Sequence, residues 1–96
     1  MCRKEWAKER RRYWKEQGEK YKDLVDEKAL SESGKYNLTK NNIDRMLSGK
    51  APKGIDGKSV NLHHVNGIKT DPFNYIELTR TEHYANFKSL HSWLYS

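Results

Sequence analysis

The chain has 96 residues, enough for one domain with a modest core but too few for two independent cores. A third of the residues are charged, yet three Trp, six Tyr and two Phe provide bulky side chains to bury, which argues against general disorder. The net charge of +6 favours a polyanionic partner, either nucleic acid or an anionic membrane surface. We expect no membrane span and no signal peptide, and the single Cys excludes an internal disulfide.

The first third of the sequence is expected to be mainly helical. Bulky apolar side chains recur at helical spacing between charged residues from about residue 5 to residue 30, and Gly18 is a possible interruption. Residues 31–34 have the composition of a short linker. We therefore expect a helical segment over residues 1–34 that packs on a core built from residues 35–96. The recurring side chains are Trp6, Tyr13, Trp14, Tyr21, Leu24 and Val25.

A second, short helix is expected to begin at Thr39, because a threonine hydroxyl can accept a hydrogen bond from the exposed N–H groups of the next turn. Gly49 and Pro52 then end the helix. The apolar face carries Ile43, Met46 and Leu47.

The second half of the chain predicts two strands and a helix. Asp56-Gly57 is a turn signal, and residues 59–65 alternate between polar and apolar side chains like a strand. Residues 75–78 form a second candidate strand, and residues 79–82 fit the capping box that opens a helix running to about Leu94. The whole chain is therefore expected to be α+β, with the order strand, loop, strand, helix near its end.

All four histidines lie between residues 63 and 91, and three of them fall at predicted element ends. Neighbouring residues of a strand point to opposite faces, so His63 and His64 cannot both enter the core unless the strand breaks there. His83 shares a helix face with Phe87 and Leu90, which taken alone suggests a histidine at the edge of the core. The clustering nevertheless favours side chains that converge around a cleft.

Several short motifs accompany these histidines. Leu62-His63-His64 is followed by Asn74, and His83 comes nine residues after that asparagine. With these and the further motifs below, the sequence resembles the HNH (His-Me finger) nucleases, and more closely the Leu-His-His type of the HNH/endonuclease VII superfamily found at the C-termini of bacterial polymorphic toxins. The resemblance covers about residues 12–91. The further motifs are Arg12-Tyr13-Trp14-Lys15, Arg45-Met46-Leu47-Ser48-Gly49-Lys50-Ala51-Pro52, Asp56-Gly57-Lys58 and Leu90-His91.

The resemblance implies a ββα-metal core with additional N-terminal helices and one bound divalent ion, either Zn²⁺, Ni²⁺, Mn²⁺ or Mg²⁺. His64 would be the general base that activates water, a task that suits imidazole because its pKa lies near neutrality. Asn74 would hold the ring of His64 in position. His63 and His83 would bind the metal, which stabilises charge on the phosphate oxygens.

The third metal ligand departs from the pattern that the resemblance implies. Many HNH nucleases place another histidine one turn after the first helix ligand, where this chain has Phe87. Asn86, three residues after His83, could supply an oxygen instead. His91 lies two turns along the helix and is expected to contact phosphate or to support a ligand.

Basic residues fall into two groups. Four that flank the histidines in sequence are candidates for phosphate contacts: Lys50, Lys53, Lys58 and Arg80. The basic run in the first helix is interspersed with glutamates and is typical of a solvated helix face rather than of a DNA groove. This run consists of Lys8, Arg10, Arg11, Arg12 and Lys15.

The function expected from these features is that of a metal-dependent endonuclease toxin that hydrolyses DNA with little sequence preference. RNA is the alternative substrate for the same site. The rival from another class is a non-catalytic nucleic-acid-binding module with a structural metal, although a closed structural site normally needs four good ligands. The resemblance to toxins also implies a cognate immunity protein, expected to be acidic, and delivery from a larger secreted or cell-surface protein into the cytoplasm of a target cell. The alternative is a stand-alone phage or host nuclease.

Overall fold

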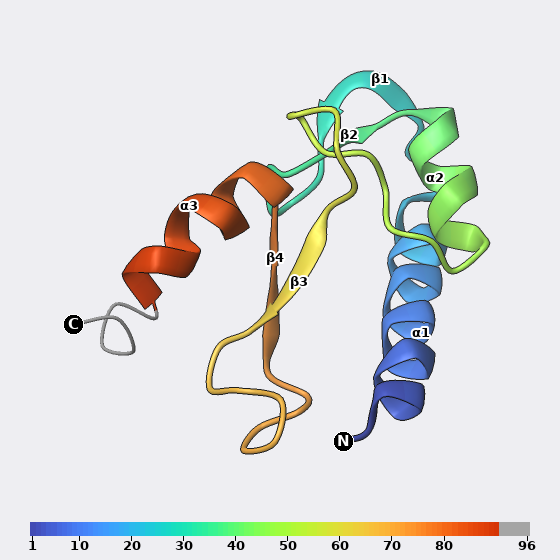
Figure 1. The fold of residues 1–96 in the computed structure, drawn as a ribbon. Coiled ribbons are helices and arrows are strands. Elements are labelled where there is room, and N and C mark those ends of the chain that lie inside the picture. Colours follow the sequence, from blue (N-terminus) through green and yellow to red (C-terminus); the bar gives the residue numbers. More distant parts are fainter. Residues whose placement is uncertain (91–96) are drawn as a thin grey trace.

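The computed structural model describes residues 1–90, with side chains through residue 85, and it is α+β as predicted (Figure 1). Within residues 1–90, no helix combines the length and the apolarity needed to cross a bilayer. The elements, in chain order, are α1 (Arg3–Tyr21), β1 (Asp26–Leu30), β2 (Asn37–Leu38), α2 (Lys40–Leu47), β3 (Asn61–His64), β4 (Tyr75–Leu78) and α3 (Arg80–Leu90).

The helix predicted to reach residue 30 ends at Tyr21, so that prediction is wrong for its last third. Gly18 does not interrupt α1 but lies buried against α2, where an added Cβ would come within 2.8 Å of the backbone nitrogen of Leu47. Tyr21 is buried, whereas Leu24 and Val25 beyond it are exposed. The helix therefore ends at Tyr21, the last of its apolar residues that packs into the core.

The segment after α1 forms a strand instead. β1 pairs with β2 in a small antiparallel sheet, in which Asp26 lies opposite Leu38 and Leu30 lies opposite Asn37 with a register shift between them. This pairing satisfies backbone groups that a continued helix would have satisfied internally. Residues 26–30, predicted as the end of the first helix, are therefore a strand.

α2 begins as predicted, because the side chain of Thr39 accepts a hydrogen bond of 3.1 Å from the backbone nitrogen of Asn42. Ile43 and Met46 are buried on its inner face, and Gly49 ends the turn that follows with a φ of 83°. Around these residues lies a core drawn from α1, from β2 and the residue before it, and from the residue before β3. Its other members are Trp14, Tyr21, Tyr36, Leu38 and Val60.

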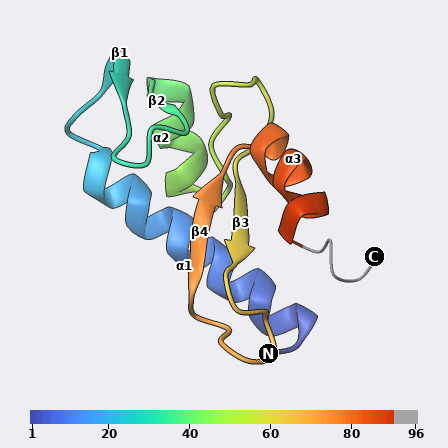
Figure 2. The same cartoon turned by 90° about the vertical axis from the view of Figure 1, so that its left-hand side faces the viewer.

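β3 and β4 form an antiparallel hairpin that lies between α1 and α3 (Figure 1), and Figure 2 shows α1 crossing behind it. The predicted capping box opens α3: the hydroxyl of Thr79 accepts from the backbone nitrogen of Glu82, and the Glu82 carboxylate accepts from that of Thr79, both at 3.0 Å. The strand, strand, helix order predicted from the sequence is therefore present. The facing pairs of the hairpin are Asn61 with Leu78, Leu62 with Glu77, His63 with Ile76, and His64 with Tyr75.

Candidate functional site

The hairpin sends the two adjacent histidines to opposite sides. Side chains of a strand alternate, so Asn61 and His63 share one face of β3, and Leu62 and His64 share the other. The face with His63 points toward α3, where His83 lies. The face with His64 points toward α1, which covers it. The candidate site is thus built on both faces of a single strand.

On the α3 side, the two candidate metal ligands meet. His63 Nδ1 and His83 Nε2 form a hydrogen bond of 3.3 Å, and the two rings are 5.2 Å apart between centroids. The other ring nitrogen of His83, Nδ1, lies 3.2 Å from the side-chain nitrogen of Asn61, which donates to it. Sequence reasoning missed Asn61, although the alternation of the strand places it on the same face as His63. The arrangement brings two imidazole nitrogens together, and Asn61 holds the ring of His83 from the side away from His63.

On the α1 side, His64 is held by a carbonyl and two aromatic rings. Its Nε2 lies 3.0 Å from the carbonyl oxygen of Pro72, which can only accept, so Nε2 carries the hydrogen. In a neutral ring, Nδ1 then has the free lone pair. The ring packs against Trp6 with centroids 4.2 Å apart, and against Tyr75 at 5.7 Å.

α1 is fastened to the hairpin by carboxylate contacts. The hydroxyl of Tyr75 donates to Glu9 at 2.5 Å, and Arg12 donates to both oxygens of the same buried carboxylate at 2.8 Å. The bond from Arg12 lowers the pKa of Glu9, and burial together with the Glu9 contact raises the pKa of Tyr75. A turn further along, the Tyr13 hydroxyl donates to the carboxylate of Glu77. These bonds set the position of α1 beside His64.

Asn74 contributes backbone bonds to the loop of the hairpin. Its carbonyl accepts from the backbone nitrogen of Val65 at 3.1 Å, and its own nitrogen donates to the carbonyl of Asp71 at 3.2 Å. The described hydrogen bond of the His64 ring is with the carbonyl of Pro72, two residues earlier in the chain than Asn74. Asn74 thereby belongs to the loop whose shape presents that carbonyl to the ring.

The start of α3, and hence the position of His83, is secured from the turn before β3. Asp56 accepts hydrogen bonds from the backbone nitrogen of Thr81 at 3.0 Å and from its hydroxyl at 2.8 Å. Those bonds, with one from the backbone of Lys58, lower the pKa of Asp56 to about 2. Lys35 forms an ion pair with Glu82 in the same turn at 2.7 Å, which lowers the pKa of Glu82.

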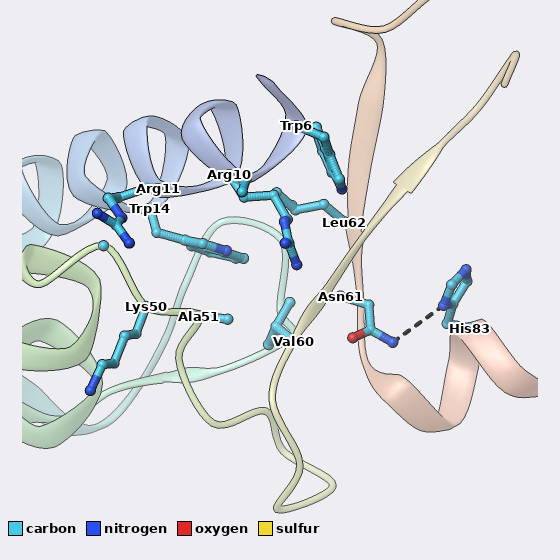
Figure 3. Close-up of a pocket in the computed structure, with 12 residues that line it drawn as sticks. Trp6, Arg10, Arg11, Trp14, Lys50, Ala51, Val60, Asn61, Leu62 and His83 are labelled. Carbon is cyan, nitrogen blue, oxygen red and sulfur yellow. Dashed lines mark hydrogen bonds between the residues drawn. The ribbon is translucent and has the colours of Figure 1, made fainter. Parts of the chain in front are cut away.

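A cavity of about 540 Å³ lies between α1, the connection from α2 to β3, and the first turn of α3 (Figure 3). Its cationic side chains are Arg10, Arg11 and Lys50, and Asn61 and His83 line its far end. Arg10 and Arg11 are exposed, as the sequence predicts for this helix face, and they also line the cavity. The other lining residues are Trp6, Ala7, Trp14, Gly49, Ala51, Val60 and Leu62.

The remaining predicted phosphate contacts lie elsewhere. Lys58 and Arg80 line a separate hollow of about 330 Å³ at the start of α3, and Lys53 is exposed where it pairs with Ser59. Of the four predicted lysine and arginine contacts, Lys50 therefore shares the larger cavity with the arginines of α1, whereas Lys58 and Arg80 share the smaller one.

Two predicted site residues fall partly or wholly outside the described part of the chain. Asn86 lies in α3, but its side chain is not described, and His91 follows the last described residue. Among residues 1–90, no group of three or more His, Cys, Asp or Glu side chains could hold a metal ion. The described donors at the site are therefore the pair His63 and His83.

Residues 41–95, more than half of the chain, match the family described as a nuclease of the HNH/ENDO VII superfamily with conserved LHH. This chain belongs to that LHH nuclease family. Comparisons with curated proteins and with solved structures returned no match. The match includes the Leu62-His63-His64 motif and His83, and it begins after α1, so the covering helix lies outside the matched region.

The carboxylate of Asp56 is expected to stabilise the LHH nuclease in a pH-dependent way. Its pKa falls from 3.8 to about 2 on folding, so its contribution is complete above pH 3.8 and disappears as the pH falls toward about 2. Asp56→Asn should lower the melting temperature at neutral pH and should match the parent near pH 2. Asp44→Asn, on the exposed side of α2, is the control. A melting-temperature difference that does not change with pH would contradict this account.

Proposed function

We propose that the LHH nuclease is a metal-dependent endonuclease that hydrolyses phosphodiester bonds in DNA with little sequence preference. The observation that carries the proposal is the approach of His63 Nδ1 to His83 Nε2, at 3.3 Å, beside an adjacent histidine held on the other face of the strand. In this proposal, β3, β4 and α3 are the ββα-metal core. The nuclease activity itself follows from the family.

The donor set fits one divalent ion. Two nitrogens that each bind a tetrahedral metal at about 2.0–2.1 Å lie about 3.3 Å apart, which agrees with the separation of His63 Nδ1 and His83 Nε2. Two imidazoles suit a borderline ion such as Zn²⁺, Ni²⁺ or Mn²⁺ better than Mg²⁺. The bound ion would supply positive charge to the phosphate oxygens and the leaving oxygen. Asn86 is the candidate for a further ligand.

His64 acts as the general base in this proposal. Because the carbonyl of Pro72 holds the hydrogen on Nε2, the lone pair of Nδ1 accepts the proton of the water that attacks phosphorus. The rings of Trp6 and Tyr75 restrict rotation of the imidazole, so Nδ1 keeps one direction. Asn74 supports the same geometry through the loop that presents Pro72.

Replacing His64 by Ala should reduce DNA cleavage by about 100-fold or more, because general bases contribute factors of that order. The parent and the variant are incubated with plasmid DNA and with total RNA in the presence of Mg²⁺, Mn²⁺, Ni²⁺, Zn²⁺ or EDTA. Val65→Ala, an adjacent and half-exposed position, is the matched control and should cleave like the parent. Cleavage of RNA alone would change the substrate, and undiminished cleavage by His64→Ala would remove His64 from the mechanism.

Metal binding should depend on the α3 face of the hairpin and not on His64. Calorimetric titration with Zn²⁺ should show one site in the parent and in His64→Ala, and no measurable site in His63→Ala or His83→Ala. When Nε2 of His83 binds the ion, the ring hydrogen is on Nδ1, so the amide of Asn61 must turn its oxygen toward that nitrogen. Asn61→Ala should then weaken binding by about 10–100-fold, because partners of ligand histidines contribute that much. EDTA should leave the circular dichroism spectrum unchanged. Unfolding by EDTA would instead favour a structural metal in a non-catalytic binding module.

A role as a delivered toxin domain is also part of the proposal. It is supported by the resemblance of the Leu-His-His pattern to polymorphic toxins and by the net charge of +6, which an acidic immunity protein would complement. Expression of the chain in a bacterial cytoplasm should arrest growth, and His64→Ala should relieve the arrest. Equal growth with both proteins would count against the toxin role and would leave the nuclease assignment in place.

A further inference from the structure

The cavity beside α1 is lined by cationic and apolar side chains. Three cationic side chains line it, and no acidic residue is among the described residues around it. Trp14 and Val60, both nearly inaccessible to solvent, are among the apolar residues of its wall. A volume of about 540 Å³ lies within the range of pockets that hold small ligands. Such a space favours an anion with an apolar or flat neighbouring group.

The two arginines are held in place without carboxylate partners. Within the described residues, neither Arg10 nor Arg11 forms an ion pair, whereas the next residue, Arg12, is bound to Glu9 and Glu16. The guanidinium of Arg10 lies 5.8 Å from the centre of the Trp6 ring. The aliphatic part of the Arg11 side chain packs closely on Gly49. A Cβ added to Gly49 would lie 2.3 Å from Cγ of Arg11. Both positive charges are therefore positioned and unneutralised.

We infer that this cavity, called the groove from here on, binds the phosphate backbone of the nucleic acid strand next to the phosphate that is cut. The inference rests on the proposed function for the identity of the cut site, because the groove ends at Asn61 and His83 (Figure 3). A strand whose scissile phosphate lies at His63 and His83 passes its neighbouring phosphates along Arg10, Arg11 and Lys50. One wall belongs to α1, outside the matched residues 41–95, and the opposite wall belongs to the match.

Phosphate contact, rather than base recognition, fits the side chains present. Arginine and lysine neutralise phosphates whatever the sequence, and Asn61 supplies the one side-chain amide among the residues that line the cavity. The groove thus gives affinity and places the strand without restricting where the enzyme cuts. An acidic protein surface is the competing occupant. Nucleic acid binding that does not depend on the arginines would favour that surface over a phosphate backbone.

The test measures binding without cleavage. His64→Ala protein is titrated in EDTA into a short fluorescent DNA duplex and a single strand of the same sequence, at several salt concentrations between about 50 and 200 mM. Adding Arg10→Ala and Arg11→Ala should weaken binding by about tenfold for each arginine. The slope of log affinity against log salt should fall by about 0.9 for each duplex phosphate that the protein no longer neutralises. Lys50→Ala, on a different segment, should act in the same direction.

Lys8→Ala combined with Lys15→Ala is the matched control, because it removes the same charge from exposed positions of α1 outside the groove. It should change affinity and slope much less than the arginine pair. If the two pairs of substitutions have equal effects, the loss of affinity follows from net charge alone, and the proposed binding in the groove is wrong. Unchanged binding by the arginine and lysine variants would overturn it as well, even with intact metal-dependent cleavage. Arginine-dependent binding by a chain that cuts nothing would support the groove while the proposed function fails.

Discussion

The alternation of side chains along β3 is the constraint on which the rest of the structure depends. Because His63 and His64 are adjacent in a paired strand, they must face opposite sides of the hairpin. A hairpin of two short strands is not stable alone in water, so each face needs a cover. α3 supplies one cover and brings His83 to His63, and α1 supplies the other and brings Trp6 to His64. The adjacent histidines thus require two helices, from opposite ends of the chain.

The attachment of α1 is polar, and this has a physical cost that the structure meets locally. Glu9 is buried, and a buried carboxylate is tolerated only when its oxygens are bonded. Arg12 and Tyr75 bond both of them, and the lowered pKa of Glu9 shows that the ionised form is the favoured one. Tyr75 also contacts the ring of His64, so the same bonds that hold the helix also restrict the candidate base.

Local signals predicted most of the chain from Thr39 onward. The capping residues Thr39 and Thr79 and the turn at Asp56-Gly57 act within one or two turns of the backbone, so the sequence alone reveals them. The end of α1 at Tyr21 could not be found this way, because it depends on where the core stops and on a pairing partner in β2. The same limit explains Asn61, whose role is visible only once His83 is placed beside it.

The arginines of α1 show most clearly what sequence cannot supply. Arg10, Arg11 and Arg12 are consecutive and chemically identical, yet a helix turns them in three directions. Two enter the groove, and the third joins Glu9. Gly49 makes the difference possible for Arg11, since its positive φ and missing Cβ let the α2 turn approach the stem. The matched LHH region thus carries the histidines, and the helix before it contributes the charge that lies beside them.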